Sequence, residues 1–298
     1  MKYDWMLIDL NNLAYRADMV VDLYTPLGKR VSAIYGSLKM LSALQRKFNP
    51  SRVFIAGDYG HNKKRVALYP EYKKKKKKAP EDETRFKMFI SQLNFMDSFF
   101  EALGVHHLKV LHQEADDIIG SLCFRDLTGD SKIIVSSDRD YAQLVDSSTH
   151  LYFPMKDLLL TDENFCKSMS VSKKGFLLFK AMVGDGSDNI KGVEGIGPKR
   201  AKGLLDKYSL EELFGGFPLP SGYKDKWFDK IQDIENIKII DRNLSLISLA
   251  ETVEPDIISG IEKELAKERR FNPKKLIDLL DECAFGSLGL EDFLVFDR

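Results

Sequence analysis

The most informative segment of the chain runs from Ala181 to Arg200 and reads AMVGDGSDNIKGVEGIGPKR. Its first half places two carboxylates, Asp185 and Asp188, in a glycine-rich turn. Its second half holds three glycines ahead of two cations, namely Gly192, Gly195, Gly197, Lys199 and Arg200. Carboxylates can hold a divalent metal, and a turn rich in backbone N–H groups can hold phosphate. The segment therefore predicts metal and phosphate binding side by side, a combination suited to hydrolysis of a phosphodiester.

The glycine turn is not a dinucleotide-binding fingerprint, because its glycine order differs and no strand is expected before it. Pro198 follows the turn and can open a helix whose N-terminal amides, together with Lys199 and Arg200, point at phosphate. Ile196 is expected to be the buried anchor of this hairpin. A plain turn between two helices is the alternative, and the sequence leaves it open.

Composition limits the class of protein. With 298 residues and 44% hydrophobic content, the chain is long enough for about two domains with a sizeable core. Lys and Arg number 45, as do Asp and Glu, so the overall charge gives no support to DNA binding. Three widely spaced cysteines predict neither a disulfide framework nor a zinc cluster and favour the cytoplasm. Early aspartates and the absence of an 18-residue apolar run predict neither a signal peptide nor a membrane span.

Short apolar runs alternate with helical patterns in the first half of the chain. The candidate strands span residues 3–10, 52–56, 105–111 and 132–136. The candidate helices span residues 31–47, 86–103 and 115–124. This alternation predicts a mostly parallel α/β sheet, in which the active crevice lies outside the carboxyl ends of the strands. Asp9, Asp58, Asp138 and Asp140 fall at such ends, although any one of them could simply cap the next helix.

A cluster of three carboxylates, Glu114, Asp116 and Asp117, begins the helix expected near residue 115. The helix dipole explains one or two acids there, whereas three unpaired carboxylates repel one another and call for a cation. The candidate metal ligands are therefore Asp9, Asp58, Glu114, Asp116, Asp117, Asp138, Asp140, Asp185 and Asp188. Oxygen ligands without Cys or His select magnesium or manganese over zinc. Two such ions about 3.5–4 Å apart could bind both the attacking and the departing oxygens of a phosphodiester.

Residues 63–78 carry nine Lys or Arg and one acid. Tyr69 and Tyr72 lie among these cations, a pattern that suits single-stranded nucleic acid, whose bases stack while its phosphates meet charges. A solvated lysine run is the alternative. If residues 72–78 are helical, Lys73, Lys76 and Lys77 share one face and are the preferred contacts.

Taken in order, these acidic motifs and the glycine hairpin resemble the 5′-nuclease (flap endonuclease) family over roughly residues 3–210. The resemblance is strongest to free-standing bacteriophage 5′→3′ exonucleases, including phage-type ribonuclease H, and to the 5′-nuclease domain of bacterial DNA polymerase I. It implies a PIN-like α/β domain, a mostly parallel sheet flanked by helices, over residues 1–170. Within that domain it implies a helical arch at about 60–102, through which a 5′ single strand passes. A helical DNA-binding lobe is expected over residues 171–298, with a helix-three-turn-helix at about 176–208.

The resemblance also implies the roles of individual residues. The nine acids would hold two Mg²⁺ ions, with Mn²⁺ as a substitute, and the hairpin carbonyls would hold a K⁺ ion. Lys73 would lie near the scissile phosphate, and Arg16, Arg65 and Tyr72 match positions associated with substrate contact or phosphate steering. Two departures stand out: Leu10 replaces the usual glycine, and Lys76 replaces an arginine that would bind phosphate through two hydrogen bonds.

We therefore predict a structure-specific nuclease that cuts DNA near the junction of a 5′ single-stranded arm and a duplex. It is also expected to act as a 5′→3′ exonuclease, and removal of RNA primers is compatible with the same site. We further expect a monomer that has partners in the replication machinery and no polymerase segment after it. The expected location is the cytoplasm, which is that of the host if the protein is encoded by a phage. Two alternatives stay open: a PIN-type ribonuclease that acts on single-stranded RNA, and a non-catalytic protein that binds DNA junctions.

Overall fold

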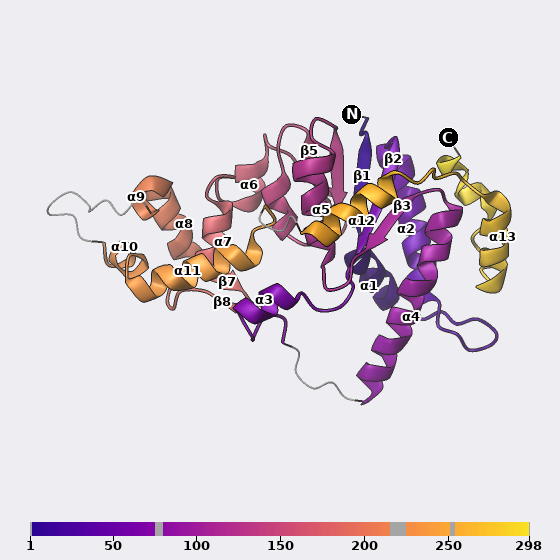
Figure 1. Ribbon diagram of the computed structural model, residues 1–298, viewed down its shortest axis with the longest axis horizontal. Coiled ribbons are helices and arrows are strands. Elements are labelled where there is room, and N and C mark those ends of the chain that lie inside the picture. The colour runs from indigo at the N-terminus through magenta and orange to yellow at the C-terminus, as the bar shows by residue number, and fades with distance from the viewer. Residues whose placement is uncertain (1, 75–79, 215–224, 251–253, 298) are drawn as a thin grey trace. The chain divides into compact units, whose positions relative to one another are not determined.

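The structure is a computed structural model that describes residues 2–74, 80–214, 225–250 and 254–297 (Figure 1). The chain forms two compact units. The first, called the sheet unit, comprises Met1–His61, Lys77–Leu159 and Val253–Arg298. The second, called the helical unit, comprises Asn62–Lys76 and Leu160–Thr252. Residues 62–74 thus pack with the helical unit and residues 254–297 with the sheet unit, which sequence patterns did not indicate. The assignment of catalysis to 1–170 and DNA binding to 171–298 stays a prediction.

The sheet unit is built on a six-stranded sheet with strand order β3-β2-β1-β4-β5-β6. The strands are β1 (Trp5–Asp9), β2 (Arg52–Gly57), β3 (His106–Lys109), β4 (Lys132–Val135), β5 (Thr149–Phe153) and β6 (Leu158–Leu160). The pairs β1–β2, β1–β4, β2–β3 and β4–β5 are parallel. Every residue of β1 is buried, as expected for a central strand covered on both faces. The predicted mostly parallel sheet is therefore confirmed.

Helices cover this sheet, and the first four of those named below carry connections between its strands. They are α1 (Leu10–Val20), α2 (Ser32–Phe48), α4 (Pro80–Ala102), α5 (Ala115–Ser121), α12 (Pro255–Leu265) and α13 (Pro273–Glu282). Short helical turns follow at η1 (Leu122–Asp126), η2 (Asp140–Leu144), η3 (Leu290–Asp292) and η4 (Leu294–Phe296). Gly104 has a φ of +68° just beyond the end of α4, a left-handed conformation that glycine readily adopts where a helix ends. Among the described residues, no helix is both long and apolar enough to cross a membrane.

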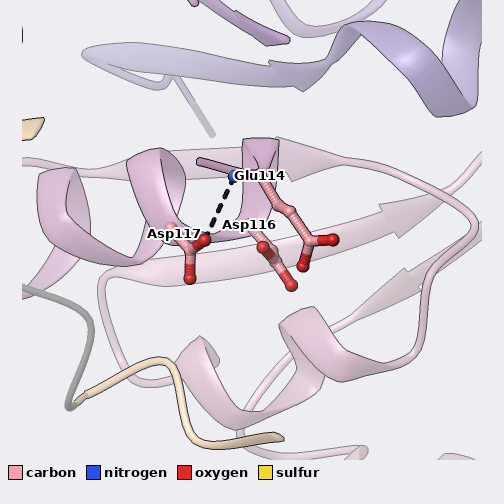
Figure 2. Close-up of side chains that lie close together, drawn as sticks. All are labelled: Glu114, Asp116 and Asp117. Atoms are coloured by element: carbon pink, nitrogen blue, oxygen red, sulfur yellow. Dashed lines mark hydrogen bonds between the residues drawn. The ribbon is translucent and has the colours of Figure 1, made fainter. Parts of the chain in front are cut away.

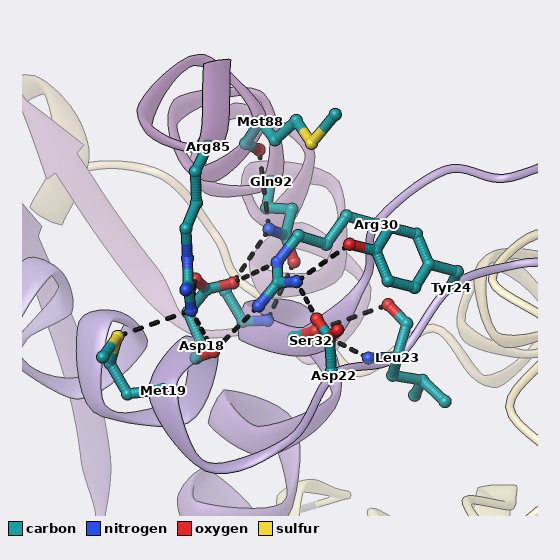
Figure 3. Close-up of polar contacts among 11 residues, drawn as sticks. Asp18, Met19, Asp22, Leu23, Tyr24, Arg30, Ser32, Arg85, Met88 and Gln92 are labelled. Carbon is teal, nitrogen blue, oxygen red and sulfur yellow. Dashed lines mark hydrogen bonds and ion pairs between the residues drawn. The ribbon is translucent and has the colours of Figure 1, made fainter. Parts of the chain in front are cut away.

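A polar network centred on Asp18 ties α1, α2 and α4 together (Figure 3). The Asp18 carboxylate is buried and accepts hydrogen bonds from Arg30 Nε at 3.0 Å and from Gln92 Nε2 at 3.3 Å. Gln92, on α4, in turn accepts from the backbone N–H of Ala33 on α2 at 2.8 Å. Because a buried carboxylate is costly unless it is paired, this network specifies how the three helices pack.

The helical unit has its own core and a short antiparallel hairpin. Its helices are α3 (Lys63–Leu68), α6 (Phe165–Met169), α7 (Phe176–Val183), α8 (Pro198–Lys207), α9 (Leu210–Phe214), α10 (Lys226–Ile231) and α11 (Ile234–Ile247). Ile196 is 3% exposed and belongs to this core, as predicted. Buried Asn243 on α11 fastens the hairpin to α7, because its Nδ2 donates to the carbonyls of Ala181 at 2.8 Å and Lys191 at 3.0 Å.

One prediction about the hairpin was wrong. The two-residue strands β7 (Gly184–Asp185) and β8 (Ile190–Lys191) pair antiparallel, and β8 directly precedes Gly192. No strand was expected before the glycines, because a strand of two residues is too short to leave an apolar pattern. It is not the parallel strand of a dinucleotide-binding unit, so the fingerprint remains excluded.

Candidate metal centre

Three carboxylates lie together where α5 begins. One side-chain oxygen from each of Glu114, Asp116 and Asp117 lies within 4.8 Å of the other two (Figure 2). Glu114 and Asp117 also form a capping box at the start of α5, in which the Glu114 backbone N–H donates to Asp117 Oδ2 at 3.1 Å. The capping explanation therefore holds for two of the acids, yet it leaves all three close enough to share a cation.

Asp9 and Asp58, at the carboxyl ends of β1 and β2, are held by specific donors. Asp9 caps α1 through the Asn12 backbone N–H, at 3.0 Å, and its other oxygen accepts from Ser136 Oγ at 3.1 Å. Asp58 Oδ1 accepts from the backbone N–H of Ala115 at 2.8 Å, which joins the end of β2 to the first residue of α5. The strand ends and the acidic cluster thus meet at one edge of the sheet.

The remaining acids of this edge, Asp138 and Asp140, follow β4. Asp138 Oδ1 accepts from the Asp140 backbone N–H at 2.9 Å, and the Asp138 backbone N–H donates to Ser136 Oγ at 3.1 Å. Ser136 therefore contacts both Asp9 and Asp138. Sequence reasoning missed Ser136, although a hydroxyl between a strand end and an acid was a usable signal.

Electrostatics show that these carboxylates are close enough to repel one another. Burial, and next the charge of Asp58, raise the pKa of Asp9 well above its ordinary value; Asp138 adds to the effect. Burial and the same acidic surroundings also raise the pKa of Tyr141, whose hydroxyl donates to Asp9 Oδ2 at 3.3 Å. A divalent cation would relieve this repulsion, and a donor set made of carboxylates suits a hard ion.

Asp185 and Asp188 belong to the helical unit and have cationic partners there. Burial opposes ionisation of Asp185, but Lys180, whose Nζ lies 2.7 Å from Oδ2, and hydrogen bonds from Ser187 lower its pKa to about 2. Asp188 Oδ2 lies 3.7 Å from the ammonium of Lys73. Sequence reasoning missed Lys180, whose pairing with Asp185 depends on how α7 ends. The nine-acid set joins residues of both units and stays a prediction.

Residues 72–74 begin the segment that is predicted to contact single-stranded nucleic acid, and they are not helical. Lys73 lies in a turn with a φ of +47°, so the helix considered for residues 72–78 is wrong at its start. Lys76 and Lys77 lie outside the described residues. Tyr72 is only 5% exposed and packs in the core of the helical unit, with the Arg65 guanidinium 5.9 Å from its ring centre. Base stacking on Tyr72 is therefore not supported by this conformation, and the DNA contacts of these residues stay predictions.

Arg16, on α1 in the sheet unit, is the other residue predicted to act on the substrate. It is partly buried, and its Nη1 has no hydrogen-bond partner among the described residues. The nitrogen atom itself is buried, so its donor capacity is unused in this conformation. The catalytic role of Arg16 stays a prediction.

The glycine hairpin has a steric basis at Gly192. A Cβ at this position would lie 2.3 Å from the backbone of Val183, so only glycine permits this approach of the chain to the end of α7. Farther on, Gly197 precedes α8, and a Cβ there would meet no atom within 4 Å. Arg200 donates to the carbonyl of Gly195 and stacks on Trp227, with its guanidinium 3.8 Å from the ring centre. Sequence reasoning missed Trp227.

Comparison with known proteins adds the family. Residues 4–172, more than half of the chain, match the family model described as 5′-3′ exonuclease, N-terminal resolvase-like domain. The chain belongs to this 5′-3′ exonuclease family. A 5′-3′ exonuclease of Aquifex aeolicus is 33% identical over 208 residues, covering 69% of this chain and 70% of that protein. The family resemblance predicted from the motifs is thereby confirmed.

Some relatives of this chain are longer proteins. DNA polymerase I of Lactococcus lactis is 30% identical over 293 residues, covering 94% of this chain and 32% of the polymerase. The chain thus spans about a third of the length of this relative.

Solved structures confirm the fold. The T5 D15 protein, co-crystallised with metal ions, superposes with a TM-score of 0.71 at 22% identity, covering 93% of this chain and 98% of D15. Human GEN1, in complex with Holliday junction DNA, gives 0.58 at 15% identity, covering 99% of this chain and 72% of GEN1. The predicted PIN-like class, a mostly parallel sheet flanked by helices, is confirmed, whereas the arch stays a prediction because residues 75–79 are not described.

Proposed function

We propose that this chain is a metal-dependent, structure-specific 5′ nuclease that cleaves DNA near the junction of a 5′ single-stranded arm and a duplex. The observation that carries the proposal is the gathering of carboxylates at the carboxyl edge of the sheet, in a chain of the 5′-3′ exonuclease family. The proposed activity includes 5′→3′ exonuclease action and removal of RNA primers during replication.

The metal is proposed to be a pair of Mg²⁺ ions, with Mn²⁺ as a substitute. Seven acids of the sheet unit would hold them, and Asp185 and Asp188 would complete the set. Bound divalent ions neutralise the charge of a phosphodiester and lower the pKa of a water molecule. The protein's own part is to orient the carboxylates. Ser136 and Tyr141 fix Asp9, and the Ala115 backbone N–H fixes Asp58.

DNA is proposed to contact both units. In the helical unit the open N-terminus of α8, with Gly197, Lys199 and Arg200, would hold duplex phosphates, and hairpin carbonyls would hold a K⁺ ion. Lys73 and Arg16 would contact the scissile phosphate, with Arg65, Tyr72, Lys76 and Lys77 along the single strand. Two solved structures with a similar fold support this proposal. One is the catalytic core of Rad2 in complex with a DNA substrate, and the other is a T5 D15 variant in complex with DNA and metal ions.

A labelled 5′-flap DNA tests the activity. We expect cleavage near the junction with Mg²⁺ and intact binding without cleavage in EDTA. Binding without cleavage at every metal concentration would instead favour a non-catalytic junction-binding protein. Faster cleavage of single-stranded RNA than of the flap, unaffected by Lys199→Ala and Arg200→Ala, would favour a PIN-type ribonuclease.

The remaining proposals concern context. A monomeric state, replication partners and a cytoplasmic location fit the proposed activity, and sedimentation of the purified chain tests the first. Cleavage of paired flap, nicked and RNA-primed substrates at equal concentration ranks the substrates.

A further inference from the structure

A small pocket lies at the end of the sheet opposite to the acidic edge. Arg52 and His106, the first residues of β2 and β3, line it, whereas Asp9 and Asp58 lie at the other ends of parallel strands. The pocket has a volume of about 300 Å³. This volume is at the lower end of the range of roughly 300–1,000 Å³ that is typical of small-molecule sites.

The lining of this pocket carries positive charge and no carboxylate. Arg52, Lys267 and Arg269 contribute three cations, and His106 adds a titratable ring. The Arg52 guanidinium lies 5.2 Å from the ring centre of Trp5 and forms no ion pair with the described residues. The whole protein has no net charge, so a wall of this kind is a local feature rather than a reflection of overall composition.

Glu264 is buried next to the pocket lining and orients two of its cations, Lys267 and Arg269. Arg269 Nε donates to Glu264 Oε1 at 2.9 Å, and Lys267 Nζ donates to Oε2 at 2.8 Å. Three cations and one carboxylate leave an excess of two positive charges. Arg269 Nη1 has no hydrogen bond to any residue that the structure describes, so a donor held in a fixed position remains for an anion.

The pocket also has a polar and an apolar recognition element. Gln45 is 3% exposed, and its Oε1 has no hydrogen-bond partner within the described part of the chain. Buried polar groups are normally paired, so this amide oxygen can accept a hydrogen bond from a ligand amino group. Phe271 and Phe296 line the same pocket and supply aromatic surface.

We propose that this pocket binds a small molecule that joins a phosphate group to an aromatic base, of the size of a deoxynucleoside monophosphate. The phosphate meets Arg52, Lys267 and Arg269, the base lies against the phenylalanines, and the amide of Gln45 contacts an exocyclic amino group. A 5′→3′ exonuclease releases such molecules, so a role in sensing product rests on the proposed function. The binding itself does not.

Calorimetric titration of the full chain with dAMP tests the proposal. Phosphate-free buffer with EDTA prevents the ligand from binding through metal at the acidic edge. We expect saturable binding of dAMP, weaker binding of inorganic phosphate and none of deoxyadenosine. The variants Arg52→Gln and Lys267→Gln should each raise the Kd for dAMP about tenfold, the effect of losing one charge-assisted hydrogen bond. Lys156→Gln, an exposed cation outside the pocket, should leave it unchanged.

The amide provides an independent check. Gln45→Leu should weaken dAMP and leave inorganic phosphate unaffected, because phosphate has no amino group to donate. The absence of saturable dAMP binding would overturn the proposal. Equal affinities in the wild type, Arg52→Gln and Lys267→Gln would overturn it too, as would phosphate binding as tightly as dAMP. None of these outcomes depends on nuclease activity, which the flap assay measures separately.

Discussion

The backbone N–H of Lys73 donates a 2.9 Å hydrogen bond to the carbonyl oxygen of Asp188, and the Lys73 ammonium lies 3.7 Å from the Asp188 carboxylate. Next to this contact, Asn189 Nδ2 donates to the carbonyl of Glu71 at 2.8 Å. Two hydrogen bonds therefore fix the turn that carries Lys73 to the hairpin that carries Asp188. A predicted catalytic cation and a predicted metal ligand are positioned by the same local structure.

Substitution of Asn189 tests this coupling. Asn189 has a φ of +60°, which glycine tolerates and alanine does not. Asn189→Gly should lose only the hydrogen bond to Glu71, whereas Asn189→Ala should also strain the turn and destabilise the helical unit by about 1 kcal/mol more. We expect flap cleavage to fall on the order of tenfold in Asn189→Ala and less in Asn189→Gly. Equal rates in both variants and the wild type would show that the turn does not position Lys73.

Loss of a predicted metal ligand should abolish cleavage and spare binding. Asp138→Ala and Asp188→Ala are expected to reduce the rate by more than about 100-fold, beyond the effect typical of a residue that only supports a ligand. Binding of flap DNA should persist in EDTA, because it is expected to depend on lysine and arginine side chains and not on the metal ions. Asp278→Ala removes an exposed carboxylate from α13 and serves as the control. Near-normal rates in both active-site variants would refute the metal assignment.

Ser136 should tune metal affinity through Asp9 and Asp138. Removing its hydroxyl in Ser136→Ala leaves two carboxylates less well oriented, and we expect the Mg²⁺ concentration for half-maximal rate to rise about 10–100-fold. Ser137→Ala is a matched control, because the Ser137 hydroxyl is buried and has no hydrogen-bond partner among the described residues. If both variants shift the Mg²⁺ dependence equally, Ser136 has no special role.

The fold class was accessible to sequence reasoning because β1, β2 and β4 are apolar runs that each lead to an acid. Strand β5 was not predicted, since its sequence, THLYF, mixes polar residues into a buried strand. Parallel pairing brings strand ends together, so Asp9 and Asp58 could be placed at one edge without coordinates. The burial of Tyr72 could not be predicted, because its neighbours in the core are distant in sequence.

Glu264 should make the stability of the sheet unit depend on acid pH. Burial opposes its ionisation, but hydrogen bonds from His106, Lys267 and Arg269 lower its pKa to about 2. Because the pKa is lowered, the contribution of Glu264 to the free energy of unfolding is complete above the unfolded-state pKa of about 4.3. It is lost as the pH falls from about 5 to 2. The loss amounts to about 3 kcal/mol.

Urea unfolding at several pH values, followed by fluorescence of Trp5, measures this contribution. The only other tryptophan, Trp227, belongs to the helical unit. The measurement is therefore made in a Trp227→Phe variant, to which Glu264→Gln is added for comparison. Glu264→Gln should be less stable at neutral pH and should lose this part of the dependence between pH 5 and 2. An unchanged pH dependence in Glu264→Gln would show that the carboxylate is not held as the contacts indicate.

Alanine substitutions at Gly197 and Gly203 distinguish an effect on the stability of α8 from an effect on its proposed contact with DNA. A Cβ at either position meets no atom within 4 Å, so neither alanine variant should disturb packing. Gly203→Ala lies within the helix and should stabilise it by about 0.4–1 kcal/mol, whereas Gly197→Ala replaces the N-cap and should cost less than about 1 kcal/mol. A duplex phosphate held at the N-terminus of α8 would meet the added methyl at residue 197 and not at residue 203. Binding of duplex DNA should therefore weaken in Gly197→Ala alone, while equal affinities in both variants would place the duplex elsewhere.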